Sequence, residues 1–211
     1  MTHARLVAEL ERRRVVAVVR CGSADAAVAA AGAIADGGVT AIEVTFTVPG
    51  AARAVAQLAG DDRLLVGAGT VLTPDEAHDA VAAGARYLIA PNFDPGVAAA
   101  ALELGTLLIP GALTPTEVAA ARRAHPLVKL FPAGYGGPEY LRALRGPFPD
   151  LRAIPTGGVT AENAGAWLAA GAVAVGAGSD LCPAALADAG ALAELRSRAE
   201  RYVSAVQEAP A

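Results

Sequence analysis

The stretch "RVVAVVRCGSADAAVAAAGAIADGGVTAIEVTF", residues 14–46, decides the fold of this chain. It begins and ends with short, almost continuously apolar runs, at 14–20 and 40–46. Such runs are too short for helices and are typical of strands buried on both faces of a parallel sheet. Between them, Ser23 precedes an Ala-rich stretch that ends in glycine, which predicts a capped helix. The stretch therefore predicts a strand–helix–strand unit.

This unit recurs along the whole chain, with capping residues again at Thr73, Thr114 and Thr160. Eight strands alternating with helices predict one α/β domain over residues 1–211, a (β/α)8 TIM barrel with an N-terminal helix at about 2–13. An open doubly wound sheet is the alternative fold. The eight apolar runs lie at 14–20, 40–46, 63–69, 86–91, 106–110, 127–131, 152–158 and 172–178.

Composition excludes several classes of function. The hydrophobic content of 54% suffices for a core, and the aromatic content of only 4% predicts a core of Ala, Val, Leu and Ile. A net charge of -4 argues against a nucleic-acid partner. No apolar run reaches the roughly 18 residues of a membrane span. Two cysteines and the lack of an apolar signal segment predict a cytoplasmic protein. The three histidines lack ligand spacing, so no metal site is predicted.

Lys129 is the only lysine, because 16 of the 17 basic residues are arginines, and it lies inside the apolar run "LVKLF". Strand alternation points its side chain into the barrel if its neighbours pack outward. A desolvated amine is partly neutral and can attack a carbonyl, whereas a guanidinium stays protonated. The alternatives are a lysine that snorkels from a strand end or a buried ion pair.

Two more charged residues belong to predicted strands. Glu43 interrupts the apolar run at 40–46, where it can shuttle protons for Schiff-base chemistry or only neutralise a buried cation. Arg20 closes the first strand and can hold a substrate carboxylate, or it is a surface strand end. In such barrels the site lies at the carboxyl ends of the strands. The polar residues at or near these ends are Arg20, Glu43, Thr45, Thr70, Asn92, Lys129, Thr156 and Ser179.

The last two strands are followed by "PTGGVTAEN" (155–163) and "VGAGSDL" (175–181), which place glycines before predicted helix N-termini. Free N–H groups there can hold an anion, and barrels commonly bind phosphate after these two strands. Both loops together predict a phosphate site. The loop "GAGTVL" (67–72) lacks the third glycine of a dinucleotide-binding loop.

The chain contains, in this order, the motifs "EVTFTVPGA", "GAGTVLTPDEA", "IAPNFDP", "VKLFPAG", "IPTGGVTAEN" and "VGAGSDL". Together they resemble the KDPG/KHG aldolase family, and the resemblance runs over nearly the whole chain. It implies a class I aldolase that acts on 2-keto-3-deoxy-6-phosphogluconate and, in some members, on 2-keto-4-hydroxyglutarate. It also implies a homotrimer with a covalent Schiff-base intermediate, a small phosphorylated keto acid as substrate, and no metal or other cofactor.

The resemblance implies roles by motif position. Lys129 in "KLFPA" is similar to the Schiff-base lysine, and Glu43 in "IEVT" is similar to the general acid/base. Arg20 and Thr70 resemble the residues that bind the pyruvyl carboxylate, and Pro91 the residue that shapes the adjoining wall. The remaining matches are Thr156 for the hydroxyl at the C4 end of the substrate, and Gly157, Gly158, Gly178 and Ser179 for the phosphate.

The sequence also departs from parts of the family. One subgroup has an arginine where this chain has Thr47, so Arg20 would hold the carboxylate alone. The motif "APN" (90–92) also occurs in the galactonate branch, but that branch tends to replace the threonine of "PTGG" with an apolar residue. Thr156 therefore favours cleavage of the phosphogluconate to pyruvate and glyceraldehyde 3-phosphate. The alternatives are a phosphogalactonate aldolase, a phosphate-binding barrel isomerase or epimerase, and a non-catalytic phosphosugar-binding protein.

Overall fold

A computed structural model of the chain describes residues 2–208, in which strands and helices alternate. Each of the eight predicted apolar runs contains a strand, and every strand residue is buried. The additional strand, β6, had not been predicted. The strands are β1 (Val15–Val19), β2 (Ala41–Thr45), β3 (Leu65–Gly69), β4 (Tyr87–Ile89), β5 (Leu107–Ile109), β6 (Gly111–Ala112), β7 (Val128–Leu130), β8 (Ala153–Pro155) and β9 (Val175–Ala177).

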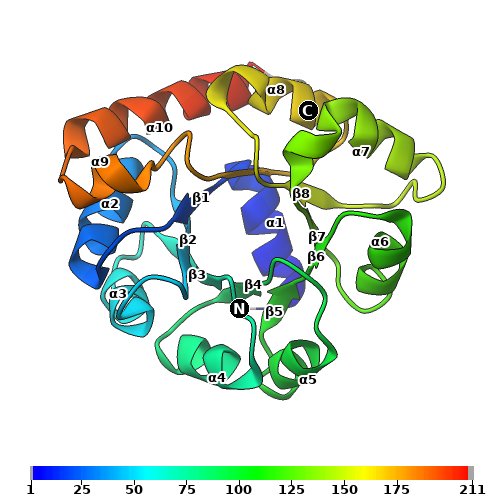
Figure 1. Ribbon diagram of the computed structural model, residues 1–211, viewed down its shortest axis with the longest axis horizontal. Coiled ribbons are helices and arrows are strands. Elements are labelled where there is room, and N and C mark those ends of the chain that lie inside the picture. Colours follow the sequence, from blue (N-terminus) through cyan, green and yellow to red (C-terminus); the bar gives the residue numbers. More distant parts are fainter. Residues whose placement is uncertain (1, 209–211) are drawn as a thin grey trace.

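Helices surround these strands (Figure 1). The predicted capping residues Ser23, Thr73, Thr114 and Thr160 are confirmed, because each side chain accepts a hydrogen bond from a backbone N–H in the first helical turn. The helices are α1 (His3–Arg13), α2 (Ala24–Asp36), α3 (Ala51–Leu58), α4 (Pro74–Ala82), α5 (Pro95–Glu103), α6 (Pro115–Ala121), the 3₁₀ turn η1 (Ala133–Tyr135), α7 (Gly137–Arg145), α8 (Ala161–Ala169), α9 (Ala184–Asp188) and α10 (Leu192–Gln207).

The strands form two parallel sheets. One has six strands in the order β5-β4-β3-β2-β1-β9, and the other has three in the order β6-β7-β8. Only Pro110 separates β5 from β6, and proline lacks the N–H that a continuous ladder needs. Between β8 and β9 the pairing reduces to isolated bridges, one of them joining Thr156 to Gly176. The predicted α/β class with a curved parallel sheet is confirmed. A complete (β/α)8 barrel is not confirmed, because the ladder is interrupted at these two junctions.

The core has two layers. The inner layer contains Leu6, Val7 and Leu10 of α1 together with residues that begin strands, among them Leu65 and Leu107. Helix α1 therefore closes the amino ends of the strands, and in Figure 1 it lies inside the ring of helices. The outer layer packs the strands against the small side chains of the surrounding helices. This arrangement leaves the carboxyl ends of the strands open.

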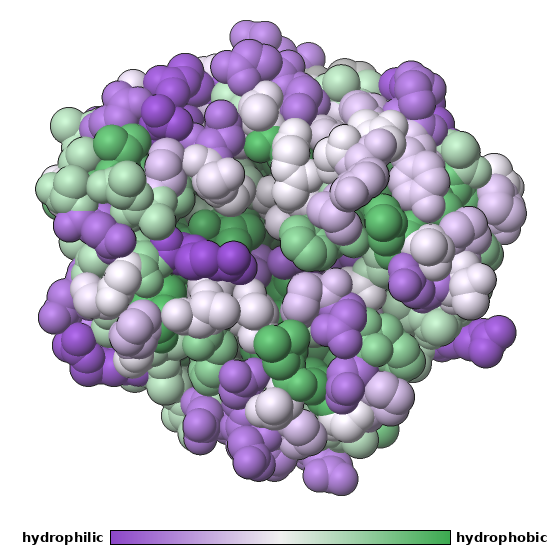
Figure 2. Space-filling view, viewed as in Figure 1, coloured by the Kyte–Doolittle hydropathy of each residue, from purple (hydrophilic) through white to green (hydrophobic). Residues whose placement is uncertain are grey.

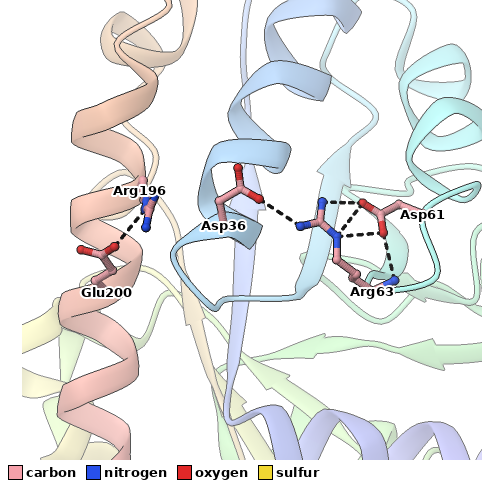
Figure 3. Close-up of polar contacts among 5 residues, drawn as sticks. All are labelled: Asp36, Asp61, Arg63, Arg196 and Glu200. Atoms are coloured by element: carbon pink, nitrogen blue, oxygen red, sulfur yellow. Dashed lines mark hydrogen bonds and ion pairs between the residues drawn. The ribbon is translucent and has the colours of Figure 1, made fainter.

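Several ion pairs lie on the outer surface. Arg63 Nη1 lies 3.0 Å from Asp36 at the end of α2, and Arg63 Nη2 lies 2.8 Å from Asp61 (Figure 3). In α10, Arg196 pairs with Glu200 at 3.0 Å. These side chains are largely exposed, so the pairs contribute little to the free energy of unfolding. Within residues 2–208, no helix has both the length and the apolar character to cross a membrane.

Candidate active site

A cleft of about 300 Å³ opens at the carboxyl ends of the strands. This face points toward the viewer in Figures 1 and 2, and Figure 2 shows it hollowed near its middle. Of the ten residues to which the family resemblance assigned a role, eight line this cleft. Of the other two, Glu43 lies beneath it and Gly158 lies beside Gly134. The predicted residues in its wall are Arg20, Thr70, Pro91, Lys129, Thr156, Gly157, Gly178 and Ser179.

Lys129 and Glu43 meet at the base of the cleft. Lys129 is the central residue of β7 and is 5% exposed, whereas Glu43 in β2 is 1% exposed. Lys129 Nζ lies 3.5 Å from Glu43 Oε1, which is ion-pair distance and the long limit of a hydrogen bond. Two buried charges this close depend on each other, because removing one leaves the other uncompensated. The pair can hold an amine and a proton acceptor side by side at a substrate carbonyl.

Glycines make room for these inward side chains. A Cβ on Gly69 would lie 1.9 Å from Glu43 Oε1, and a Cβ on Gly67 would lie 2.3 Å from the ring of Tyr87. The Tyr87 hydroxyl donates to the carbonyl of Ile42 at 3.0 Å. Burial, and then the charge of Glu43, raise the pKa of Tyr87 well above its usual value, so the hydroxyl stays protonated. Sequence reasoning had not identified Tyr87, because an aromatic residue in a strand is ordinary.

One side of the cleft carries a guanidinium and a hydroxyl. Arg20 Nη2 donates to Thr70 Oγ1 at 3.3 Å, and both residues line the cleft with Pro91. Thr70 has a φ of 54°, a conformation rare for a β-branched residue and one that clusters at functional sites. Thr47, at the position of the missing family arginine, is exposed and its hydroxyl lies 2.9 Å from that of Thr45. Arg20 is therefore the arginine that lines this cleft.

The opposite side is built from the loops after β8 and β9. Thr156 is 7% exposed, and its hydroxyl occupies space that a Cβ on Gly176 would fill at 2.1 Å. Gly157 and Gly158 have φ values of 82° and 85°, which favour glycine. Their left-handed backbone turns the loop after β8 at the edge of the cleft.

The helix N-termini themselves offer less to an anion than the sequence suggested. In α8, the N–H of Asn163 donates to Thr160 Oγ1 at 3.3 Å, and the N–H of Ala161 donates to Asp180 Oδ2 at 3.3 Å. Helix α9 has only five residues. The loops before these helices offer further donors. Within residues 2–208, no protein acceptor is hydrogen-bonded to the backbone N–H groups of Gly158, Gly178 and Ser179.

The cleft also contains residues that the sequence reasoning had not assigned to the site. Phe131 is 36% exposed, and its ring centroid lies 5.4 Å from Lys129 Nζ. Because it follows Lys129 by two positions in an extended segment, alternation would have predicted the shared face. Cys182 also lines the cleft. The Cys182 thiol lowers the pKa of Cys21, and the Cys21 thiol, together with burial, raises the pKa of Cys182. Val18 and Ala184 complete the wall.

A second cavity, of about 380 Å³, lies at the opposite end of the strands beside α1. It contains arginines such as Arg5 and Arg86, together with the carboxylates of Glu9, Asp61 and Asp62. It is larger than the cleft, but its lining has no lysine that could form a Schiff base, so it is not the candidate active site. Among residues 2–208, no cluster of three or more His, Cys, Asp and Glu side chains is arranged to hold a metal ion.

Fold and cleft together define an α/β enzyme whose site buries a lysine amine against a carboxylate. Residues 6–197 match the sequence profile of the family described as KDPG and KHG aldolase. The chain therefore belongs to the KDPG/KHG aldolase family. Its relatives are named as aldolases, so the chain is a carbon–carbon lyase.

Curated relatives include enzymes named for both epimeric substrates. The 2-dehydro-3-deoxy-phosphogluconate aldolase of Treponema pallidum (strain Nichols) is 36% identical over 93% of this chain and 95% of its own length. The 2-dehydro-3-deoxy-6-phosphogalactonate aldolase of Escherichia coli (strain K12) is 35% identical over 79% of this chain and 83% of its own length. Similarity to these relatives therefore does not distinguish the two substrates.

A solved relative shows the kind of intermediate that the family forms. The KDPG aldolase from Legionella pneumophila, with pyruvate captured as a covalent carbinolamine, has a TM-score of 0.85 and 31% identity to this chain. The alignment covers 92% of this chain and 96% of that chain. A carbinolamine is the adduct of an amine with a carbonyl and precedes a Schiff base. The family's chemistry thus uses a covalent intermediate rather than a separate cofactor.

Proposed function

We propose that the chain is a class I aldolase that cleaves 2-keto-3-deoxy-6-phosphogluconate to pyruvate and glyceraldehyde 3-phosphate. The observation that carries this proposal is the buried pair of Lys129 and Glu43, 3.5 Å apart at the base of the cleft. A lysine is the side chain that can form a Schiff base with a ketone, and the neighbouring carboxylate can transfer the protons this chemistry needs. An isomerase would need the carboxylate but no covalent bond to the lysine.

The two sides of the cleft suit the two anionic ends of this substrate. Arg20 and Thr70 bind the carboxylate beside the reactive ketone, with Pro91 as the adjoining wall. The loop N–H groups of Gly157, Gly158, Gly178 and Ser179 bind the phosphate. The support for this orientation is that Lys129 lines the cleft together with the first group and with all of the second group except Gly158.

In the proposed reaction, the Lys129 amine attacks the C2 ketone and forms a carbinolamine. Glu43, directly or through a water, protonates the departing hydroxyl, and loss of water leaves the iminium. Glu43 then takes the proton of the C4 hydroxyl while the C3–C4 bond breaks. The bonding electrons move into the iminium, which becomes an enamine, and glyceraldehyde 3-phosphate leaves. Protonation of the enamine at C3 and hydrolysis by water release pyruvate and restore the amine.

The choice of the phosphogluconate over its epimer rests on Thr156. Its hydroxyl lies at the end of β8, in the wall of the cleft, where it can contact the C4 end of the substrate. A site that hydrogen-bonds a hydroxyl discriminates strongly against a substrate that places it wrongly. The phosphogalactonate is the second candidate, because the E. coli relative of that name is 35% identical. Comparison of kcat/KM for the two epimers, and for 4-hydroxy-2-oxoglutarate, decides between them.

The first test of the proposed chemistry is reduction with borohydride in the presence of pyruvate, followed by intact-mass and peptide mass spectrometry. We expect one reduced pyruvyl adduct, located on Lys129, and none in Lys129→Arg, which keeps the positive charge beside Glu43. We expect Glu43→Gln to lower kcat by roughly 10² to 10⁴-fold, the usual scale for a positioned acid/base. A folded wild-type protein that forms no adduct overturns the aldolase proposal and favours the isomerase or epimerase.

We propose further that residues 1–211 form one domain whose two sheets act as a single closed barrel. In support of this, Pro110 alone separates β5 from β6, and Thr156 bridges Gly176 between β8 and β9. By resemblance to its family, the protein is proposed to be a cytoplasmic homotrimer. Light scattering at several protein concentrations tests the trimer.

A further inference from the structure

Asp180 connects the two loops of the proposed phosphate site. It follows Ser179 in the loop after β9, and its Oδ2 accepts a hydrogen bond from the N–H of Ala161 at 3.3 Å. Ala161 is the first residue of α8 and directly follows the loop after β8. One carboxylate thus joins the two segments that carry the free N–H groups.

Helix α10 adds two further connections to the same loops. Arg198 Nη1 donates to the backbone carbonyl of Asp180 at 2.6 Å. The hydroxyl of Tyr202, which is fully buried, donates to the carbonyl of Val159 at 3.2 Å. Burial, and then the charge of Asp180, raise the pKa of Tyr202, so the hydroxyl remains a donor. A single rigid helix therefore holds one residue from each loop.

The direction in which the Asp180 carboxylate points decides whether its negative charge opposes phosphate binding. An aspartate beside a phosphate site would repel the ligand if it faced the cleft. This carboxylate instead accepts from the first N–H of α8, where the helix dipole favours negative charge. The Asp180 carboxylate thus has its hydrogen-bond partner within the protein. The loop N–H groups of Gly178 and Ser179 are left for the phosphate of the ligand.

We infer that Asp180 is a positioning residue that fixes the separation of the two phosphate-binding loops and so sets the affinity for the phosphorylated end of the substrate. The inference rests on the proposed function. Asp180 lies within the motif "VGAGSDL", but no role has been proposed for it among the cleft residues. Its effect acts through the loops, so the chemistry at Lys129 is independent of it.

The experiment compares wild type with Asp180→Ala by two readouts. One is affinity for phosphate, measured as KM for the phosphorylated keto acid and as competitive inhibition by inorganic phosphate. The other is the pyruvate concentration that gives half-maximal adduct on reduction with borohydride, which involves no phosphate. We expect KM and the inhibition constant to rise about tenfold or more, because a bond to a charged group is lost. We expect kcat and the pyruvate readout to stay within about twofold.

Two matched variants separate the effect of losing the hydrogen bond between Asp180 and Ala161 from the effect of losing a negative charge. Asp180→Asn keeps an acceptor oxygen for the N–H of Ala161, so we expect it to recover most of the phosphate affinity. Glu162→Gln removes a negative charge from an exposed position in the first turn of the same helix. We expect it to leave both readouts unchanged. If Asp180→Ala does not fold, Tyr202→Phe tests the same network through the carbonyl of Val159.

Unchanged phosphate inhibition in folded Asp180→Ala overturns the inference, and so does an equal loss in the phosphate and pyruvate readouts. If Asp180→Ala does not fold, unchanged phosphate inhibition in Tyr202→Phe overturns it instead. Failure of the proposed function is a different result, because it is the absence of any pyruvyl adduct in the wild-type protein.

Discussion

Among single residues, Gly69 controls the placement of Glu43 most directly. A Cβ at this position would lie 1.9 Å from Glu43 Oε1 and 2.4 Å from its Cδ. In Gly69→Ala the carboxylate must therefore move, because no real contact is that short. We expect kcat to fall by at least about tenfold, toward the roughly 10² to 10⁴-fold loss expected for Glu43→Gln. Steady-state kinetics measure this loss, and circular dichroism reports whether the fold is retained.

A suitable control is Gly32→Ala in α2, where an added Cβ meets no atom within 4 Å. Alanine in a helix interior is more favourable than glycine by roughly 0.5 to 1 kcal/mol, so this variant should be slightly more stable and fully active. Normal kcat in a folded Gly69→Ala protein would show that Glu43 tolerates displacement and is not the acid/base.

From the sequence alone, we could predict the site residues that are unusual for their predicted surroundings. Lys129 and Glu43 stood out because a charge inside an apolar strand has few explanations. Tyr87 is an ordinary strand residue, so nothing in the sequence indicated that its ring would lie against Gly67, the strand partner of Glu43. Asp180 is equally ordinary as a loop residue. Its role depends on Ala161, 19 positions away, which only the packing of two neighbouring strands brings close.

At the scale of elements, the capping box of α6 makes a pH-dependent contribution to stability. Glu117 Oε2 accepts from the N–H groups of Thr114 and Leu113, at 2.8 and 2.9 Å. These bonds lower the pKa of Glu117 below its usual 4.5, so the folded state favours the ionised form. Its contribution is therefore complete above pH 4.5 and is lost as pH falls through the lower folded value. We expect Glu117→Gln to be less stable than wild type at pH 7, by no more than about 1 kcal/mol at this exposed site.

Urea unfolding at pH 7 and at several values below 4.5 measures the difference, which should shrink as pH falls. Glu103→Gln, at the exposed end of α5, serves as the control for loss of one surface charge. A difference between wild type and Glu117→Gln that stays constant across this pH range would contradict the assignment.

The strands also show what the hydrophobic pattern could not predict, which is how they pair. The run at 106–110 predicted one strand, but pairing continues past Pro110 into β6 with a different neighbour. Hydrophobic pattern reports burial, whereas hydrogen-bond partners depend on which N–H groups exist and where they point. Pro110 contributes no N–H, yet its carbonyl still accepts from Lys129 N at 2.9 Å. The pattern could therefore locate the buried strands without locating the break in the ladder.

In the whole molecule, the strands run parallel, so the residues of the inner core and those of the candidate site lie at opposite ends of the strands. Every strand begins at the end that α1 covers and finishes at the end that holds the cleft. Substitutions at the amino ends should therefore change the free energy of unfolding, and those at the carboxyl ends should change catalysis. The sequence could predict this polarity, because parallel strands joined by helices have no other arrangement.

Leu10 provides the direct test of that separation. It is 0% exposed and packs from α1 into the inner core. Leu10→Ala leaves a cavity, so we expect the free energy of unfolding to fall by about 2 to 5 kcal/mol, while kcat/KM per folded molecule stays unchanged. Leu102→Ala is the control, because Leu102 is 80% exposed and should cost less than about 0.5 kcal/mol. Denaturant unfolding and kinetics at a temperature where both variants are folded provide the comparison. A loss of kcat/KM in folded Leu10→Ala would mean that the inner core transmits packing changes to Lys129, so that the two ends of the strands are coupled.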